Sequence, residues 1–232
     1  MIPIIPEEKW LNFLKDHPLW IPPNSKTIIL APHPDDETLG AGGLIVDLRK
    51  KNIDVIIIAV TDGENAYKDM TGLRQIRQKE QEKALQKLGI AKSNIIRLQL
   101  EDSAVHLAEN QLEHSLLPFI NSHTNLIAPW IGDFHSDHEA AGRVAVKIAN
   151  YLKINLIFYF FWTWHRSTIS AISHLPLSIY PLCANTLNLK KMAIACYSSQ
   201  QRYPANNSIL TKKLLKPAER QFEVFLNYKN LY

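Results

Sequence analysis

Two short clusters carry reactive side chains at a spacing suited to metal chemistry: HPDDE, which begins at His33, and HSDHE, which begins at His135. In the first cluster His33 and Asp36 stand three residues apart, and in the second His135 and His138 have the same spacing. Imidazoles and carboxylates together suit a catalytic zinc ion, which takes three protein ligands and keeps one position open. Iron(II) or manganese also accepts such ligands. Neither cluster contains a cysteine, which argues against a closed structural zinc site.

A divalent cation held in this way favours hydrolysis. It lowers the pKa of a bound water toward about 7 and polarises a carbonyl group. A carboxylate beside that water can then act as a base. The first cluster offers three adjacent carboxylates, Asp35, Asp36 and Glu37, which repel one another unless they have different partners.

Each cluster also has a purely structural interpretation. Acidic residues are favoured at the start of a helix, so 35–37 fits an N-cap followed by a first turn. Ser136 or Asp137 likewise fits the N-cap of a second helix. This interpretation is weakened because both clusters fall at the ends of apolar, strand-like segments, and because one reads His-x-x-Asp and the other His-x-x-His.

Short β-branched runs alternate with amphipathic stretches along most of the chain. The pattern predicts strands at 26–31, 54–60, 94–100, 124–130 and 154–161. It predicts helices at 38–51, 71–88, 107–121, 136–152 and 217–226, with a strand running into a helix at 186–201. Such alternation predicts an α/β fold, a Rossmann-like and mostly parallel sheet flanked by helices. No linker interrupts the pattern, so we expect one domain over 1–232.

Polar side chains gather where the predicted strands end. Ligands bind at the carboxyl ends of the strands in an open parallel sheet. Besides the two clusters, these ends hold Asp62, Glu64, Glu101, Asp102, Asp133, Trp162, Trp164 and His165. Five successive strand ends that deliver acids, imidazoles or indoles to one edge predict a functional site there.

Composition argues against several other classes of protein. The net charge of +4 is mild and the basic residues are dispersed, unlike those of a nucleic-acid-binding surface. The apolar run 154–164 is shorter than the roughly 20 residues that span a bilayer, and the N-terminus does not resemble a signal peptide. Two cysteines, Cys183 and Cys196, lack a CxxC partner. We therefore expect a cytoplasmic protein with neither a nucleic-acid nor a membrane partner.

The motifs PHPDDETLGAGG and HSDHEAAGR together resemble the zinc-dependent PIG-L (LmbE-like) N-deacetylases. These enzymes hydrolyse the acetamide of N-acetylglucosamine-type sugars and their conjugates. Weaker matches are TDGE at 61–64, a helix with the pattern RxxE…A…LG from Arg77 to Gly89, and YSSQ at 197–200. The resemblance runs from about 26 to 200.

The resemblance implies a role for each matching residue. His33, Asp36 and His138 would be the metal ligands, and Asp35 the general base. His135 would face the developing oxyanion or protonate the leaving amine, with Asp137 orienting or charging its ring. The residues implied or considered on the substrate side are Arg77, Asp62, Glu64 and Trp164.

The expected cofactor is one Zn²⁺ per chain, with Fe²⁺ or another divalent metal as the alternative. The expected substrate is an N-acetylated amino-sugar-type small molecule. Two other functions stay open at this point: an amidase that acts on another N-acyl compound, and a catalytically silent sugar-binding protein of the same fold.

Overall fold

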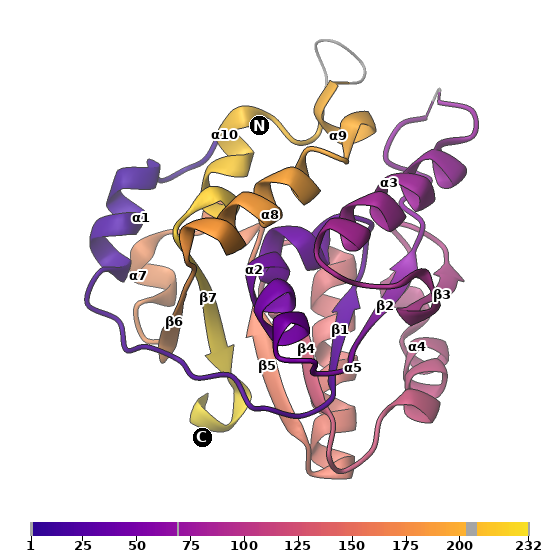
Figure 1. Ribbon diagram of the computed structural model, residues 1–232, viewed down its shortest axis with the longest axis horizontal. Coiled ribbons are helices and arrows are strands. Elements are labelled where there is room, and N and C mark those ends of the chain that lie inside the picture. The colour runs from indigo at the N-terminus through magenta and orange to yellow at the C-terminus, as the bar shows by residue number, and fades with distance from the viewer. Residues whose placement is uncertain (1, 69, 203–207, 232) are drawn as a thin grey trace.

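A mostly parallel sheet of seven strands, in the order β3-β2-β1-β4-β5-β7-β6, organises this computed structural model, which describes residues 2–68, 70–202 and 208–231 (Figure 1). Strands β1 to β5 pair in parallel, and β7 pairs antiparallel with both β5 and β6. This arrangement confirms the predicted α/β class. The strands are β1 Thr27–Ala31, β2 Val55–Thr61, β3 Ile95–Leu100, β4 Asn125–Pro129, β5 Asn155–Tyr159, β6 Leu177–Pro181 and β7 Phe222–Asn227.

Helices cover both faces of the sheet. In Figure 1, α2 and α8 lie in front of the central strands and α5 lies behind them. The helices are α1 Glu7–Leu14, α2 Asp36–Lys50, α3 Leu73–Lys87, α4 Glu109–Leu116, α5 Ser136–Leu152, α6 Thr163–Arg166, α7 Ile169–Ile172, α8 Ala184–Ile194, α9 Ser198–Arg202 and α10 Lys212–Leu215. Short 3₁₀ turns lie at Lys92–Asn94, Val105–Leu107, Leu117–Phe119, Lys216–Glu219 and Tyr228–Leu231.

The central strands are buried on both faces, because successive side chains point to opposite sides of a strand. In β1, Ile28 and Leu30 join the core under α1, α4 and α5. Ile29 and Ala31 join the core under α2, α3 and α8. The continuous apolar runs of the sequence are the consequence of this double burial.

Helix α2 packs unusually close to the sheet. A Cβ atom on Gly40 would lie 2.3 Å from the ring of Tyr159, so only glycine fits there. The helix is interrupted at Ala41, whose backbone is not helical (φ −140°, ψ 16°). Glu223 of β7 accepts hydrogen bonds at 2.7 and 2.8 Å from the backbone N–H groups of Gly43 and Leu44, just after the interruption. The start of α2 is thereby fixed against the sheet.

The C-terminal part differs from the sequence prediction. The predicted helix at 217–226 is a 3₁₀ turn followed by β7, because this segment pairs with both β5 and β6. The segment 186–201 contains no strand and instead holds most of α8 and α9. The predicted helix 107–121 is broken into α4 and flanking 3₁₀ turns; the second contains Pro118, which lacks an N–H group. Helix α1 and strand β6 were not predicted.

In the part of the chain that the structure describes, no helix combines the length and the apolar character needed to cross a bilayer.

Candidate metal and active site

The two clusters meet at the switch point of the sheet. Strand β1 lies between β2 and β4, so the connections that leave β1 and β4 diverge. A crevice forms outside the carboxyl ends of strands at such a point. HPDDE follows β1 and HSDHE follows the loop after β4, which places both clusters at this crevice.

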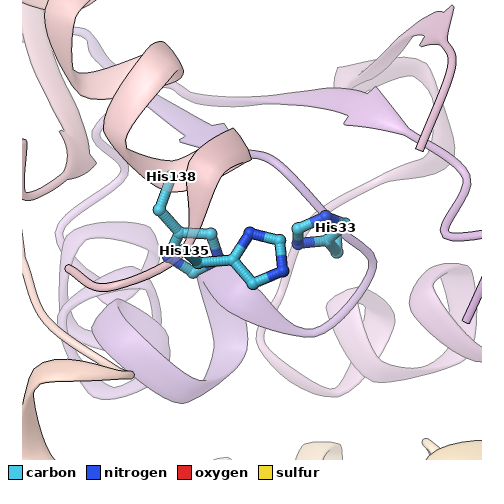
Figure 2. A group of neighbouring side chains, drawn as sticks. All are labelled: His33, His135 and His138. Atoms are coloured by element: carbon cyan, nitrogen blue, oxygen red, sulfur yellow. The ribbon is translucent and has the colours of Figure 1, made fainter. Parts of the chain in front are cut away.

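Two imidazoles and one carboxylate converge there. Asp36 Oδ2 lies 3.2 Å from His33 Nδ1 and 3.1 Å from His138 Nε2. Two ligands of a tetrahedral zinc ion, with bonds of about 2.0–2.1 Å, are roughly 3.3 Å apart, so these separations fit a bound cation. Ligand atoms of His33, His135 and His138 also lie within 4.8 Å of one another, and Figure 2 shows the three rings as neighbours.

The ring of His138 is oriented from behind by Asp133. His138 Nδ1 lies 2.8 Å from Asp133 Oδ2, and because a carboxylate only accepts, Nδ1 carries the proton. In the neutral ring the lone pair is then on Nε2, which is buried, lies 3.1 Å from Asp36 Oδ2 and makes no hydrogen bond with any of the described residues. A carboxylate behind a metal-binding histidine is the usual arrangement in metal sites. The free Nε2 of His138 therefore fits a metal ligand.

The carboxylates around His33 and His138 favour a positive charge at this site. Burial lowers the pKa of His138, but the nearby charge of Asp36 and the hydrogen bond to Asp133 outweigh it and raise the pKa to about 9. Burial opposes protonation of His33 too, yet hydrogen bonds with three carboxylates hold its pKa well above 6.5. A divalent cation held by His33, Asp36 and His138 would supply the charge that this site favours.

Asp35 is held in a strained conformation by Arg77. Its φ of 129° lies in the half of backbone space that non-glycine residues rarely adopt, at a cost of about 1–3 kcal/mol. Arg77 Nη2 donates to the carbonyl oxygen of Pro34 at 2.7 Å and to Asp35 Oδ2 at 3.1 Å. Burial raises the pKa of Asp35 to about 8, although the charge of Arg77 opposes the rise. The result is a positioned carboxylate with a raised affinity for protons.

His135 is neutral in this environment. Burial, followed by the charges of His33 and His138, lowers its pKa to about 4. Its Nδ1 accepts a hydrogen bond at 3.3 Å from the backbone N–H of Asp137, so the ring proton is on Nε2. The Asp137 carboxylate contacts His33 Nε2 at 3.1 Å. Its charge favours the protonated ring of His135, but burial and the charges of His33 and His138 outweigh it. The backbone N–H of Asp137 contacts the same ring, and the resemblance implied that Asp137 orients or charges it.

A pocket of about 230 Å³ opens beside these residues. It is lined by His33, Asp35, Asp36, Ala66, Arg77, Asp102, Ser103, His135, Phe161, Trp162, Arg166, Gln200, Ile209 and Leu210. His138 and Asp137 lie behind this lining and contact Asp36 and His33 respectively.

Three residues expected on the substrate side lie elsewhere. Asp62 is buried and bonds Gln78 Nε2 at 2.7 Å, which ties the end of β2 to α3. Glu64 pairs with Arg74 at 2.8 Å. Trp164 lies in α6 and packs against Trp10 of α1, with ring centroids 5.2 Å apart. None of the three is among the residues that line the pocket.

The structure shows partners of strand-end residues to which the sequence assigned no individual role. Asp133 accepts hydrogen bonds from the backbone N–H groups of 161, 162 and 163, as well as contacting His138. It thus fixes the loop that presents Trp162, whose ring stacks near His135 with centroids 5.9 Å apart. Arg166 lies over the same indole, 4.5 Å from its centroid. No local sequence signal links Asp133 to these partners.

Replacing Asp133 with asparagine is expected to weaken cation binding by roughly 10- to 100-fold. The amide keeps the shape of the carboxylate but lacks its charge, so the ring of His138 is less firmly oriented and less basic. Competition with a chelator of known affinity measures the effect. Asp54→Asn, at an exposed carboxylate, is the matched control. Equal affinity in Asp133→Asn and the unchanged protein would contradict the assigned role.

A separate pocket of about 340 Å³ lies between the N-terminal segment 2–8 and α10, and His165 lines it. Burial lowers the pKa of His165 from 6.5 to about 4. Folding therefore favours the neutral ring, and its full contribution to stability is present above about pH 6.5 and is lost as the pH falls toward 4. The difference between the two pKa values corresponds to roughly 3 kcal/mol.

We expect His165→Phe to make the free energy of unfolding less dependent on pH between 4 and 6.5. The phenyl ring retains the packing against Phe161 but takes up no proton. Urea unfolding at several pH values measures the slope, and His123→Gln, at an exposed histidine, serves as the control. An unchanged slope in His165→Phe would show that His165 does not contribute to it.

The fold and the site together define the class of protein. It is an α/β protein with a pocket at the switch point of the sheet, and the residues at this pocket fit a divalent cation. The family model PIG-L, described as GlcNAc-PI de-N-acetylase, matches residues 28–149, which is more than half of the chain and includes both clusters. The chain belongs to this family.

Individual relatives agree with that assignment. Diacetylchitobiose deacetylase of Thermococcus kodakarensis is 26% identical over 134 residues, which cover 54% of this chain and 49% of that protein. The chain thus spans about half the length of this curated relative.

Solved structures share the fold. The N,N'-diacetylchitobiose deacetylase from Pyrococcus horikoshii, in complex with its inhibitor MPG, gives a TM-score of 0.66 at 23% identity and covers 89% of this chain and 84% of its own. The zinc-inhibited form of teicoplanin deacetylase gives a TM-score of 0.66 at 14% identity, with coverage of 87% and 97%.

Proposed function

We propose that the chain is a zinc-dependent N-deacetylase that removes the acetyl group from an amino sugar or an amino-sugar conjugate. The observation that carries the proposal is the convergence of His33, Asp36 and His138 beside Asp35, which Arg77 holds at the same pocket. Membership in the PIG-L family supports it. The names of the chitobiose deacetylases support the choice of an amino sugar.

An amide resists hydrolysis because water is a poor nucleophile and an amine is a poor leaving group. A divalent cation held by His33, Asp36 and His138 would supply an activated water and polarise the acyl oxygen. Of the carboxylates that line the pocket, Asp35 is the one that pairs with Arg77 rather than with a histidine. In the proposed reaction Asp35 takes the proton that the attacking water loses as its oxygen bonds to the acyl carbon.

His135 supplies a neutral donor. Because its Nδ1 accepts from the backbone, its Nε2–H is available to the acyl oxygen as negative charge develops there. When the C–N bond breaks, Asp35 returns its proton to the leaving nitrogen. Asp35 is then ionised again, and the products are acetic acid and a free amine, which become acetate and an ammonium group near neutral pH.

The experiment that tests the proposal combines metal analysis of the purified protein with an acetate-release screen over N-acetylglucosamine, N,N'-diacetylchitobiose and larger N-acetylated conjugates. We expect one divalent cation per chain and acetate release from at least one of these compounds. Zinc is added both at one equivalent and in excess, because a zinc-inhibited form of a related fold is known. A metal-loaded protein that releases no acetate from the whole panel would overturn the proposal.

The same assay distinguishes the two alternatives. Formyl, propionyl and longer acyl groups on one amino sugar test for a general amidase, which would prefer one of them over acetyl. Binding of the acetylated sugar without release of acetate would identify a silent sugar-binding protein.

A further inference from the structure

The interruption of α2 at Ala41 separates a short first turn, 36–40, from the rest of the helix. This turn carries Asp36, whose carboxylate contacts both His33 and His138. A single turn is not stable by itself, because fixing the first turn of a helix is unfavourable and only further turns offset that cost. The position of Asp36 therefore depends on groups outside α2 that hold the turn in place.

Two side chains from other elements bond the backbone of α2 at the interruption. Glu223 of β7 accepts from the N–H groups of Gly43 and Leu44, at 2.7 and 2.8 Å. Lys190 of α8 donates through Nζ to the carbonyl oxygen of Leu39 at 3.0 Å. A helical segment lacks internal partners for the carbonyl groups at its end and for the N–H groups at its start. Lys190 and Glu223 supply partners of both kinds where α2 stops and restarts.

The same two side chains form a buried ion pair. Lys190 Nζ lies 2.7 Å from Glu223 Oε1, and the two side chains are 1% and 2% exposed. Figure 1 shows α8 beside α2 on the front of the sheet, so Lys190 has only a short distance to cross. The carboxylate lies at the start of a helical segment and the ammonium group at the end of one, which is the arrangement that the helix dipole favours.

The surroundings of the pair argue against a ligand site there. A cavity of about 10 Å³ lies beside Lys190 and Glu223, roughly the space that one water molecule needs. The α2 backbone also approaches Lys190 closely, since a Cβ atom on Gly42 would lie 3.2 Å from Lys190 Cγ. A glycine of the first motif thus lets the lysine reach the interruption. The pair is built to contact α2.

The turn 36–40 is held at its start, along its length and at its end. Arg77 donates to the carbonyl oxygen of Pro34, just before the turn. Within the turn, Glu37 accepts from the hydroxyl group of Tyr197 at 2.6 Å. The bond at the far end is the one that the ion pair supplies through Lys190. Loss of that bond would free the end of the turn that carries Asp36.

We propose that Lys190 and Glu223 are positioning residues for the cation site: they hold the turn 36–40 so that Asp36 faces the two histidines, and they thereby raise the affinity for a divalent cation. The inference rests on the proposed function for the presence of that cation. Both residues act through the backbone of α2, because their bonds to this helix go to its N–H and carbonyl groups.

The test compares Lys190→Met with the double variant Lys190→Met/Glu223→Gln. Methionine keeps the apolar stem of lysine but cannot donate to Leu39. The single variant leaves the charge of Glu223 buried and unpaired, whereas the double variant removes both charges. Competition with a chelator of known affinity gives the affinity for zinc, and urea unfolding of the cation-free protein gives its stability. The visible absorption of the Co²⁺-loaded protein reports the geometry of the ligands.

We expect both variants to bind zinc roughly 10-fold more weakly, because both lack the donor to Leu39, and to show an altered Co²⁺ spectrum. Stability should fall in Lys190→Met and recover at least in part in the double variant, since an unpaired buried charge is more destabilising than the absence of the pair. Affinity and stability then change differently, which a merely structural role of Lys190 does not predict. The double variant also carries the test if Lys190→Met does not fold.

The matched control is a second buried ion pair, in which Arg220 Nε lies 2.6 Å from Glu7 Oε1. It links α1 to the residues before β7, and within the described residues neither side chain bonds α2. Glu7→Gln/Arg220→Met should leave the affinity for zinc and the Co²⁺ spectrum unchanged.

Unchanged zinc affinity in both Lys190 variants, or an equal loss in the control, would overturn the inference. The outcome does not depend on the proposed reaction, because a protein that binds zinc but releases no acetate would overturn the deacetylase and leave this comparison intact. An unchanged protein that binds no divalent cation would overturn the inference itself.

Discussion

Asp35→Asn is expected to lower the rate of acetate release by roughly 10²–10⁴-fold while the protein still binds its cation. The amide has the shape of the carboxylate but cannot take a proton from the attacking water. Asparagine also tolerates positive φ better than most residues, so the strained backbone at this position is preserved. Asp36 Oδ2 lies 3.1–3.2 Å from the rings of His33 and His138, whereas Asp35 pairs with Arg77, so the variant leaves the proposed metal ligands unchanged.

The comparison with Asp36→Asn makes the experiment specific. That variant alters the oxygen shared by His33 and His138, so it should lose cation and activity together. Metal content by mass spectrometry and acetate release are measured on both variants. Asp35→Asn with full metal content and undiminished activity would exclude Asp35 as the base.

Arg77→Met is expected to destabilise the protein by about 3–5 kcal/mol and to reduce activity as well. Arg77 is 4% exposed, and its removal leaves the buried carboxylate of Asp35 without its charged partner. The carbonyl groups of Pro34 and Gly63 also lose their donors. Urea unfolding gives the free energy, and acetate-release kinetics separate kcat from KM.

A double-mutant cycle assigns the cause. In an Asp35→Asn background, Arg77→Met removes the remaining charge of this buried pair, so it should cost less there by about 0.5–3 kcal/mol. Arg143→Met is the control, because Arg143 forms an exposed ion pair with Glu109 that contributes about 0–1 kcal/mol. A higher KM at unchanged stability would instead support the substrate-side role that the family resemblance suggested for Arg77.

The sequence predicted those parts of the fold that depend on local patterns. Strand β1 and helix α5 were located closely because an apolar run and an amphipathic run mark them directly. Strand β7 was wrongly predicted as a helix, because its identity comes from antiparallel partners far away in the chain. Short strand β6 ends in Pro181, and its partner is this same β7.

The sequence likewise predicted some contacts of the candidate site and missed others. His33, Asp36 and His138 follow strand ends whose meeting place is set by parallel topology, so the sequence sufficed to group them. The contact of Asp137 with His33, and of Arg77 with Asp35, depends on side-chain directions that spacing does not specify. Gln200, which lines the pocket, belongs to α9, and Ser199 of α9 bonds Glu80 of α3; no local sequence pattern indicates this contact.

Asp133 has one further consequence, since a single carboxylate contacts both His138 and the backbone of the loop that carries Trp162. A movement of that loop would alter the basicity of the His138 imidazole, and a cation bound to His138 would alter how tightly the loop is held. Where two ligands are coupled in this way, thermodynamic reciprocity requires each to change the affinity for the other by the same factor. A ligand that seats against Trp162 should therefore raise the affinity for the cation by the same factor by which the cation raises the affinity for that ligand.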